Sequence, residues 1–539
     1  MLIDHSGPAL LLVRCGIWLF GYLGFGCFIY FLLALFIFGL PGISHPVSIA
    51  IECIGAIEIL WYLLWYLPYR LYLGRPGLPL DTITKDERHG LYRKLITNIP
   101  DAHLFMRKWF CNAHLDEIYR EDIKDWLLWA LWNKWHRPEE DMEENEELEH
   151  LIDEWEEHTG MHFRKGRGGA TAIRASLDPV ATRHASLLWY WTVGALDLLT
   201  TAWLMIWLGF RFYRQPLLSF FTNFPFRPMT LLSPRRSAAP SFSYFYRPVV
   251  NPKTGGPKKR TVVFMHGIGM GLSAYLMWLN SLPKDIGLLL VEFMPVSSRI
   301  CPQAVSQREF VSSMRAILSQ HSLEDVVLVG HSYGTLMVRS LLDDPIVNSK
   351  VHSVILIDPA SIMMHMPELG YNIMKRKPET APQLEMQWFA AADPRTAHTL
   401  TRRLHWQDCI LWREQLLEKR TTVVVASRDC VTSPSATASY VYYGHVNYHE
   451  SDKKEWRKTP DTWTGRGELE LFYLWDRDHG QGLLAPGEIK RINRIVPLAD
   501  EEKPSAMAVE NSSHAESMVD PGEQTNEKHY SAITNSAAV

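Results

Sequence analysis

The seven cysteines of this 539-residue chain are scattered singly, and no two of them form a C-x-x-C pair. An odd, dispersed set does not build a disulfide framework, so we interpret these residues as buried free thiols. The sequence also lacks zinc-finger spacing, a Walker phosphate loop and a G-x-G-x-x-G nucleotide motif. We therefore expect no cofactor and no metal site.

An excess of charge of one sign is also missing, because 55 Lys and Arg residues oppose 59 Asp and Glu residues. The formal net charge of −4 gives no reason to expect a nucleic-acid partner. Apolar residues are plentiful instead: 47% of the chain is hydrophobic, with 20 Trp, 21 Tyr and 22 Phe residues. The length is enough for more than one folding unit.

Two long apolar runs lie near the N-terminus, at residues 17–40 and 47–67. The first carries no charge, and the second is broken only by Glu52 and Glu58. Each is long enough to span a bilayer, and the short Pro- and Gly-containing turn between them does not resemble a signal-peptide cleavage site. We predict a transmembrane helical hairpin over residues 1–72, in which Glu58 faces the partner helix or is protonated.

The distribution of basic residues predicts the orientation of this hairpin. Arginines and lysines follow the second run, from Arg70 onwards, and the turn between the runs has none, so both ends of the hairpin should be cytoplasmic. A third apolar run covers residues 187–210, with Asp197 near its centre, and is equally compatible with a third span or with an interfacial or buried helix. The side of the membrane occupied by the rest of the chain depends on that choice. We expect an internal membrane, either the endoplasmic reticulum or a lipid droplet, and the sequence names no protein partner.

A helical, Trp-rich region is predicted over residues 73–245. In the stretch Ile123–Trp132, apolar residues recur at the spacing of an amphipathic helix. Its Trp stripe fits either a membrane surface or packing within its own domain, and packing is the commoner case. An acidic run over residues 139–157 is interpreted as a solvated helix and not as a metal site.

The most informative stretch is Gly330–Gly334, which has the pattern G-x-S-x-G. Four apolar residues, Val326–Val329, precede it as in a buried strand, and Thr335–Leu342 reads as a helix. A strand, a sharp turn and a helix form the setting of a nucleophile elbow, in which the strained turn exposes the serine. We predict that Ser332 is a nucleophile and that the flanking glycines give the backbone room.

A second predicted loop follows the strand that ends just before His266. His266 and Gly267 are followed by Ile268 and then by Gly269, and such glycines let the backbone come close to a substrate. In this position we expect half of an oxyanion hole, formed by the N–H of Ile268. The N–H of Tyr333, directly after the serine, would supply the other half. We interpret His266 as a brace for the loop and not as a base.

Predicted strands alternate with helices along the second half of the chain, which indicates a mostly parallel sheet with helices on both faces. The strands are predicted at residues 261–265, 288–291, 326–329, 351–357, 421–426 and 469–473. In such sheets, sites lie at the carboxyl ends of the strands. Ser332, Asp429 and His479 each follow such an end, in the order nucleophile, acid, base. Asp358, after the strand 351–357, is the rival acid.

The region 246–498 resembles the α/β-hydrolase fold. The elbow at Ser332, the loop at His266 and Gly267, and the base His479 carry this resemblance. The whole chain is similar to fungal membrane-anchored α/β hydrolases, a group without an assigned substrate. The further similar stretches are Trp126–Ala130, Tyr371–Pro378 and His479–Gln481. Two features differ from the usual pattern of the family. Ser427 stands where many members have Gly, and the residue spacing can also be counted so that Cys430, and not Asp429, occupies the usual position of the acid.

The resemblance implies that Ser332 attacks an ester carbonyl, His479 takes its proton and Asp429 orients the imidazole. It implies a serine hydrolase acting on an ester, which we expect to be lipidic because the anchor holds the site at a membrane. An acyltransferase with the same triad and a non-catalytic membrane scaffold are the alternatives. The insertion 361–420 is predicted to be a helical cap.

Apolar residues of the insertion fit either an acyl pocket or the core of the cap itself. These residues are Met363, Met364, Met366, Trp388, Phe389, Leu400, Leu404 and Trp406. The polar tail, residues 499–539, is predicted to be disordered.

Overall fold

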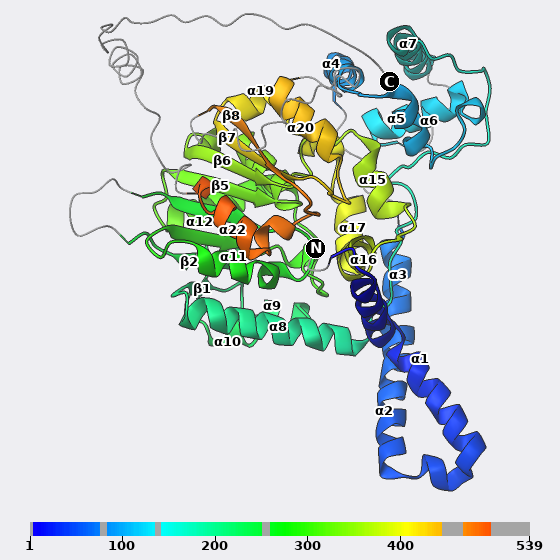
Figure 1. Ribbon diagram of the computed structural model, residues 1–539, viewed down its shortest axis with the longest axis vertical. Helices are drawn as coiled ribbons and strands as arrows, with labels where there is room; N and C mark the ends of the chain where they lie inside the picture. Colours follow the sequence, from blue (N-terminus) through cyan, green and yellow to red (C-terminus); the bar gives the residue numbers. More distant parts are fainter. Residues whose placement is uncertain (1–3, 76–82, 135–141, 251–258, 445–466, 497–539) are drawn as a thin grey trace, which may run out of the picture. The chain divides into compact units, whose positions relative to one another are not determined.

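The computed structural model describes residues 4–75, 83–134, 142–250, 259–444 and 467–496. The tail 499–539, predicted to be disordered, lies outside the described residues. The described part is organised around one eight-stranded sheet (Figure 1). Its strands are β1 (Arg211–Tyr213), β2 (Tyr244–Arg247), β3 (Thr261–Met265), β4 (Gly287–Val291), β5 (Val326–His331), β6 (Val351–Ile357), β7 (Arg420–Ala426) and β8 (Leu469–Leu474).

Along the sheet the strands follow the order β1-β2-β4-β3-β5-β6-β7-β8. β1 pairs with β2 and β2 with β4 in antiparallel fashion, and all other neighbouring strands are parallel. The predicted mostly parallel sheet is therefore confirmed. The sheet begins well before the expected boundary at residue 246, because β1 and β2 extend its edge.

Helices cover both faces of the sheet (Figure 1). Consecutive residues of β3 alternate between two cores: Val263 packs in one and Val262 in the other. An apolar run without polar interruption is what a strand buried on both faces requires. One face is covered by α12 (Gln307–Gln320), α13 (Gly334–Leu342), α14 (Pro345–Asn348) and α20 (Pro434–Tyr443), and the other by α11 (Leu276–Ser281) and α22 (Pro486–Ile492).

The helical region that precedes the sheet packs on itself and on the insertion. Its helices are α4 (Lys85–Thr97), α5 (Ala102–Trp109), α6 (Arg120–Trp132) and α7 (Met142–Thr159). Trp126 and Trp129 of α6 are buried, and Trp126 contacts Trp155 of the acidic helix α7. Of the two interpretations of the Trp stripe, the structure therefore supports packing within the protein.

The N-terminal hairpin consists of α1 (Gly7–Ile43), α2 (Pro46–Trp61), the π-helical turn Tyr62–Tyr66 and α3 (Leu67–Leu73). Within the described residues, two helical segments are long and apolar enough to cross a membrane, namely α1 and Pro46–Leu73. A Cβ on Gly24 of α1 would lie 2.9 Å from the Cβ of Glu58, so the two helices approach closely at a small residue. Glu58 thus faces the partner helix, as predicted.

The third apolar run forms α8 (Leu187–Ile206), which is not among the two candidate spans. Asp197, near its middle, is turned toward the protein and pairs with Arg227 at 2.9 Å and with Arg299 at 2.9 Å. A carboxylate bound by two arginines is not a group that needs to face lipid. The structure therefore favours the packed alternative for this run over a third span.

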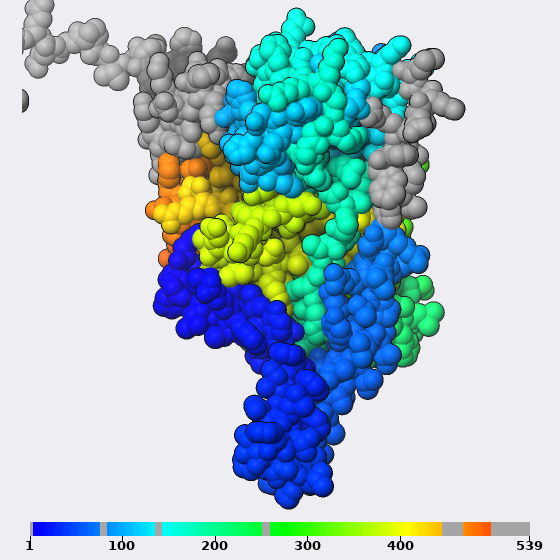
Figure 2. All heavy atoms as spheres, turned by 90° about the vertical axis from the view of Figure 1, so that its right-hand side faces the viewer, coloured from blue at the N-terminus to red at the C-terminus, as the bar shows by residue number. Residues whose placement is uncertain are grey.

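The insertion between β6 and β7 is mostly helical. Its helices are α15 (Pro367–Met374), α16 (Ala381–Glu385), the π-helical turn Met386–Ala391, α17 (Pro394–Arg402), α18 (Trp406–Cys409) and α19 (Arg413–Leu417). The first turns of α1 pack on α16 through Ala9, Val13 and Ala381. Figure 2 shows the N-terminal helix, in dark blue, lying along the yellow-green insertion.

Candidate active site

Ser332 lies at the turn between β5 and α13, where its backbone adopts a φ of 54°. This left-handed conformation is strained for a residue with a side chain and is the one expected of the elbow. A Cβ on Gly334 would lie 2.0 Å from the carbonyl oxygen of Met265, and one on Gly330 would lie 2.8 Å from Val338. The two glycines therefore allow strand and helix to meet at this angle.

The structure brings together the three residues predicted from their order in the chain. The Oγ of Ser332 lies 2.8 Å from Nε2 of His479, and Nδ1 of His479 lies 2.7 Å from Oδ2 of Asp429. All three side chains are buried. This chain of hydrogen bonds allows the imidazole to take the serine proton while the carboxylate stabilises the resulting positive charge.

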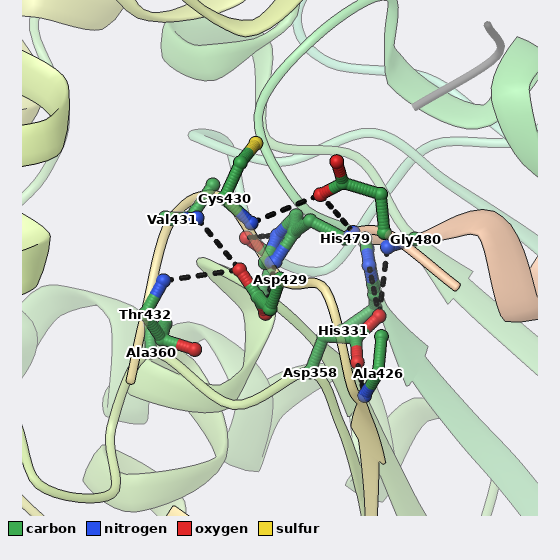
Figure 3. A network of polar contacts seen from close by, with 12 residues as sticks. His331, Asp358, Ala360, Ala426, Asp429, Cys430, Val431, Thr432, His479 and Gly480 are labelled. Carbon is green, nitrogen blue, oxygen red and sulfur yellow. Dashed lines mark hydrogen bonds and ion pairs between the residues drawn. The ribbon is translucent and has the colours of Figure 1, made fainter. Parts of the chain in front are cut away.

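Asp429 is held by its own loop (Figure 3). Its Oδ1 accepts hydrogen bonds from the N–H groups of Val431 at 2.7 Å and of Thr432 at 3.0 Å, which leaves Oδ2 for the histidine. Two side chains of the insertion fasten the same loop: Asn372 donates to the carbonyl of Val431, and Arg376 donates to that of Cys430. The stretch Tyr371–Pro378, singled out by resemblance, thus supports the acid.

Asp358, the rival acid, lies below this site and makes no direct hydrogen bond to the imidazole of His479. It accepts the N–H of Ala426 at 2.8 Å and the N–H of Gly480 at 2.7 Å (Figure 3). It thereby links the end of β6 to the end of β7 and to the loop that carries the base. The geometry assigns the acid position to Asp429 and a bracing position to Asp358.

The two carboxyl groups differ in their ionisation. Burial raises the pKa of Asp358 to about 6, and the neighbouring Asp429 adds to the rise. Burial opposes ionisation of Asp429 as well, but His479 and the two N–H donors hold its pKa below the ordinary value. Burial disfavours protonation of His479, yet the Asp429 carboxylate raises the pKa of the imidazole above its ordinary value. An ionised acid beside a basic imidazole is the arrangement that general-base catalysis needs.

The loop after β3 lies against the elbow. A Cβ on Gly267 would lie 2.9 Å from the Cβ of Ser332, so only glycine fits there. The N–H groups of Ile268 and Tyr333 donate to no acceptor within the described parts of the chain. Both residues also line the cavity at Ser332. These two N–H groups lie where the predicted oxyanion hole would be.

His266 braces this loop. Its Nε2 accepts the N–H of Phe293 at 3.0 Å, so the proton is on Nδ1, which donates to the carbonyl of Gly267 at 2.8 Å. Sequence reasoning missed Tyr275, whose hydroxyl accepts the N–H of Gly267 and donates to Nδ1 of His331 at 2.7 Å. No motif marks Tyr275, since it reaches the loop from the following helical turn.

An apolar cavity of about 100 Å³ opens at Ser332. Of the insertion residues proposed for an acyl pocket, Met364, Leu400, Leu404 and Trp406 line it. Met363 and Met366 pack in the core instead, and Trp388 and Phe389 lie against Gly21 and Gly16 of α1. The helical region supplies further lining residues that the sequence did not suggest, among them Trp109 and Trp129.

A second cavity of about 100 Å³ also opens at the serine. Ser332 and His479 line it together with Met386, Phe389 and Leu483. The serine thus borders two cavities, and a substrate with an acyl part and an alcohol part needs space for both.

Residues 260–424 match the family model described as the alpha/beta hydrolase fold. No curated protein matches the chain, so the resemblance to fungal membrane-anchored members stays a prediction. Among solved structures, a carboxylesterase from Bacillus subtilis is 12% identical, with 47% of this chain and 86% of that chain covered and a TM-score of 0.29.

Two further solved structures show a similar degree of likeness. An esterase from Thermogutta terrifontis is 11% identical, with 48% and 95% of the two chains covered and a TM-score of 0.33. A meta-cleavage product hydrolase from Pseudomonas fluorescens is 14% identical, with 49% and 95% covered and a TM-score of 0.32. The sheet order, the elbow and the family match together show that the domain carrying Ser332 has the α/β-hydrolase fold.

Proposed function

We propose that this protein is a serine hydrolase that cleaves a carboxylic ester with an apolar acyl chain and that the N-terminal hairpin anchors it in a membrane. One observation carries the proposal: the Oγ of Ser332 is within 2.8 Å of Nε2 of His479, at the opening of an apolar cavity. A nucleophile, a base and an apolar acyl pocket in one place are what ester cleavage requires.

The reaction begins when Nε2 of His479 takes the proton of Ser332 and Oγ attacks the ester carbonyl carbon. The carbonyl oxygen gains negative charge, which the N–H groups of Ile268 and Tyr333 stabilise. Asp429 keeps the imidazole in the tautomer that can accept this proton and stabilises the imidazolium. The tetrahedral intermediate then collapses as the imidazolium gives its proton to the departing alcohol oxygen.

The acyl group remains bonded to Oγ of Ser332 after the alcohol leaves. His479 next takes a proton from a water molecule, the hydroxide attacks the acyl carbon, and the proton passes to Oγ as the acid leaves. The acyl chain occupies the cavity lined by Trp129, Met364 and Leu400. The apolar lining favours a hydrocarbon chain over a polar acyl group.

A fluorophosphonate probe tests the proposal, because it reacts covalently with an activated serine. We expect the probe to label the full-length protein in membranes and Ser332→Ala to abolish labelling. Ser340→Ala is the matched control, since Ser340 is also buried but its hydroxyl only donates to the carbonyl of Leu336. Folded wild-type protein that takes no label, or label that persists in Ser332→Ala, would contradict the proposal.

A further inference from the structure

Helix α8 and the two short helices after it, α9 (Ser219–Thr222) and α10 (Pro228–Leu232), lie next to one another (Figure 1) and expose several large apolar side chains on and beside them. We define this apolar face by six residues that are each more than half exposed: Leu199, Ile206, Trp207, Leu218, Phe221 and Leu232. The segment 215–226 contains no charged residue. Exposed apolar surface of this extent marks an interaction site.

Buried ion pairs fix the apolar face to the hydrolase domain. Arg227, which precedes α10, pairs with Asp197 of α8 at 2.9 Å and with Glu292, which follows β4, at 2.8 Å. Arg299 pairs with Asp197 from another side at 2.9 Å. Asp197 points inward together with the buried Thr200 and Leu204, three and seven residues after it, whereas Leu199 and Ile206, two and nine residues after it, lie on the opposite side of α8 and point outward. The face is therefore a rigid part of the domain that carries the serine.

The apolar face is continuous with the hairpin. Both carboxylate oxygens of Glu58, on α2, accept the N–H of Leu187 at the start of α8, each at 3.0 Å. Trp61 of α2 packs against Phe224, between α9 and α10, with ring centroids 5.9 Å apart. A helix that begins at a membrane-spanning segment and exposes Trp and Leu side chains has the character of an interfacial helix.

A cavity of about 380 Å³ opens beside this face and leads inward. Leu218 of the apolar face lines its outer part, and Gln303 there donates a hydrogen bond to the hydroxyl of Tyr72, on α3, at 2.5 Å. Its inner end is lined by Tyr333, Leu336 and Leu404. The same three residues line the cavity at Ser332, so the two cavities adjoin at these side chains.

We propose that the apolar face lies in the boundary between headgroups and acyl chains of the bilayer, and that the cavity beside Leu218 admits the acyl chain of a lipid ester from that boundary to Ser332. The second half of this proposal rests on the proposed function. Continuity with the hairpin selects the bilayer as the occupant of the face. The substrate is accordingly a lipid that is withdrawn sideways from the membrane and not one that arrives from water.

Depth-dependent quenching tests the membrane contact without any activity. Single cysteines at Leu199→Cys and Phe221→Cys, in a full-length background whose exposed Cys15, Cys53 and Cys111 are serine, carry a fluorophore. In phosphatidylcholine vesicles containing nitroxide-labelled phosphatidylcholine, we expect strong quenching at both positions. Ile346→Cys is the control, since Ile346 is 51% exposed but lies before β6, at the other end of the strands. Quenching at residues 199 and 221 no stronger than at residue 346 would overturn the membrane contact, as would a protein partner that covers the face instead.

Ester hydrolysis tests the access route. We expect the double variant Leu199→Glu and Phe221→Glu, at two residues of the apolar face that do not line the cavity, to hydrolyse a long-chain ester embedded in these vesicles about ten-fold more slowly, because the charges oppose insertion. Hydrolysis of a short water-soluble ester should stay within about two-fold of wild type, and Ile346→Glu should change neither rate. An unchanged rate on the embedded ester would overturn the route while leaving the proposed function intact. A wild-type protein that hydrolyses neither ester would instead remove the proposed function and the route together, and quenching would still decide the membrane contact.

Discussion

Two buried aspartates lie beside one histidine, and hydrogen-bond geometry separates their roles. Asp429 contacts Nδ1 of His479 at 2.7 Å, whereas Asp358 accepts hydrogen bonds from the backbone N–H groups of Ala426 and Gly480. A carboxylate on Nδ1 fixes the tautomer that lets Nε2 act as a base. A carboxylate on backbone groups fixes the position of the loop. The two substitutions to asparagine should therefore differ in their effect.

We expect Asp429→Asn to lower kcat by about 10⁴-fold, because the amide stabilises the wrong tautomer of His479. Asp358→Asn should lower kcat by less than about ten-fold but reduce thermal stability, because an amide offers one acceptor where two N–H groups need one each. Steady-state kinetics on a short ester and a thermal melt of both variants provide the comparison. A larger loss of kcat in Asp358→Asn than in Asp429→Asn would reverse the assignment of the acid.

The pH dependence of the reaction follows from the raised pKa of His479. The imidazole must be neutral to accept the serine proton, so kcat/KM should rise with pH through the pKa of His479. Asp429 is the group that raises this pKa. We therefore expect the acidic limb of the profile to move to lower pH in Asp429→Asn, as measured by kcat/KM against pH. A limb that stays in place would show that His479 does not set it.

At the scale of residues, the elbow and the order of the three side chains were predictable because local sequence and strand ends fix them. The residues that hold the loops of the site in place were not predictable. Tyr275, Asn372 and Arg376 act on backbone groups of distant loops, and nothing in their local sequence indicates such contacts. The choice between Asp429 and Asp358 also needed geometry, since both follow a strand.

The helix α8 shows how one buried charge decides the environment of an element. Its mean composition is apolar enough to suggest a span, yet Asp197 is bound by two arginines of the hydrolase domain. Removing one partner of a buried ion pair leaves the remaining charge less well paired, which costs up to about 3–5 kcal/mol. Without Asp197, Arg227 would keep Glu292, whereas Arg299 would lose this carboxylate.

We expect Asp197→Asn to destabilise the domain by an amount of that order, because Arg227 and Arg299 lose their shared carboxylate. Asp153→Asn is the matched control: Asp153 also pairs with an arginine, Arg120, but its side chain is 66% exposed. Its loss should leave stability almost unchanged. Thermal unfolding of both variants in detergent provides the test, and equal shifts in Tm would contradict the structural role given to Asp197.

At the scale of elements, the inner strands were predictable and the edge strands were not. β3 to β7 each contain a run of four apolar residues, and their predicted positions are confirmed within one or two residues. β1 has three residues and β2 has four, and both pair antiparallel at the edge of the sheet. Such short aromatic stretches carry no periodic signal, so their place depends on pairing with β4 alone. Likewise, some apolar residues of the insertion line the cavity, others pack in the core and others contact α1, and their composition does not predict which of these they do.

For the whole molecule, the packed position of α8 leaves two predicted spans and so fixes the expected topology. If the hairpin spans a membrane, we expect the hydrolase domain to lie on the same side as both hairpin ends, and the distribution of basic residues predicts that this side is the cytoplasm. We expect a membrane-impermeant maleimide to label Ile346→Cys in sealed microsomes, and to label Ser44→Cys, in the turn of the hairpin, only after detergent. Both variants need the background in which Cys15, Cys53 and Cys111 are serine. Labelling of the two positions under the same conditions would contradict the hairpin topology.

The cavity at Ser332 is walled on one side by Trp109 and Trp129, which belong to helices α5 and α6 that precede the sheet in the chain. Under the proposed function, part of the acyl pocket is therefore encoded in a stretch of sequence that contains none of the three triad residues. We then expect substitutions in α5 and α6 to change the length of the accepted chain while the elbow, the acid and the base stay as they are. Relatives of this protein can thus differ in the acyl chain length that they accept while each of them, and each intermediate between them, remains active.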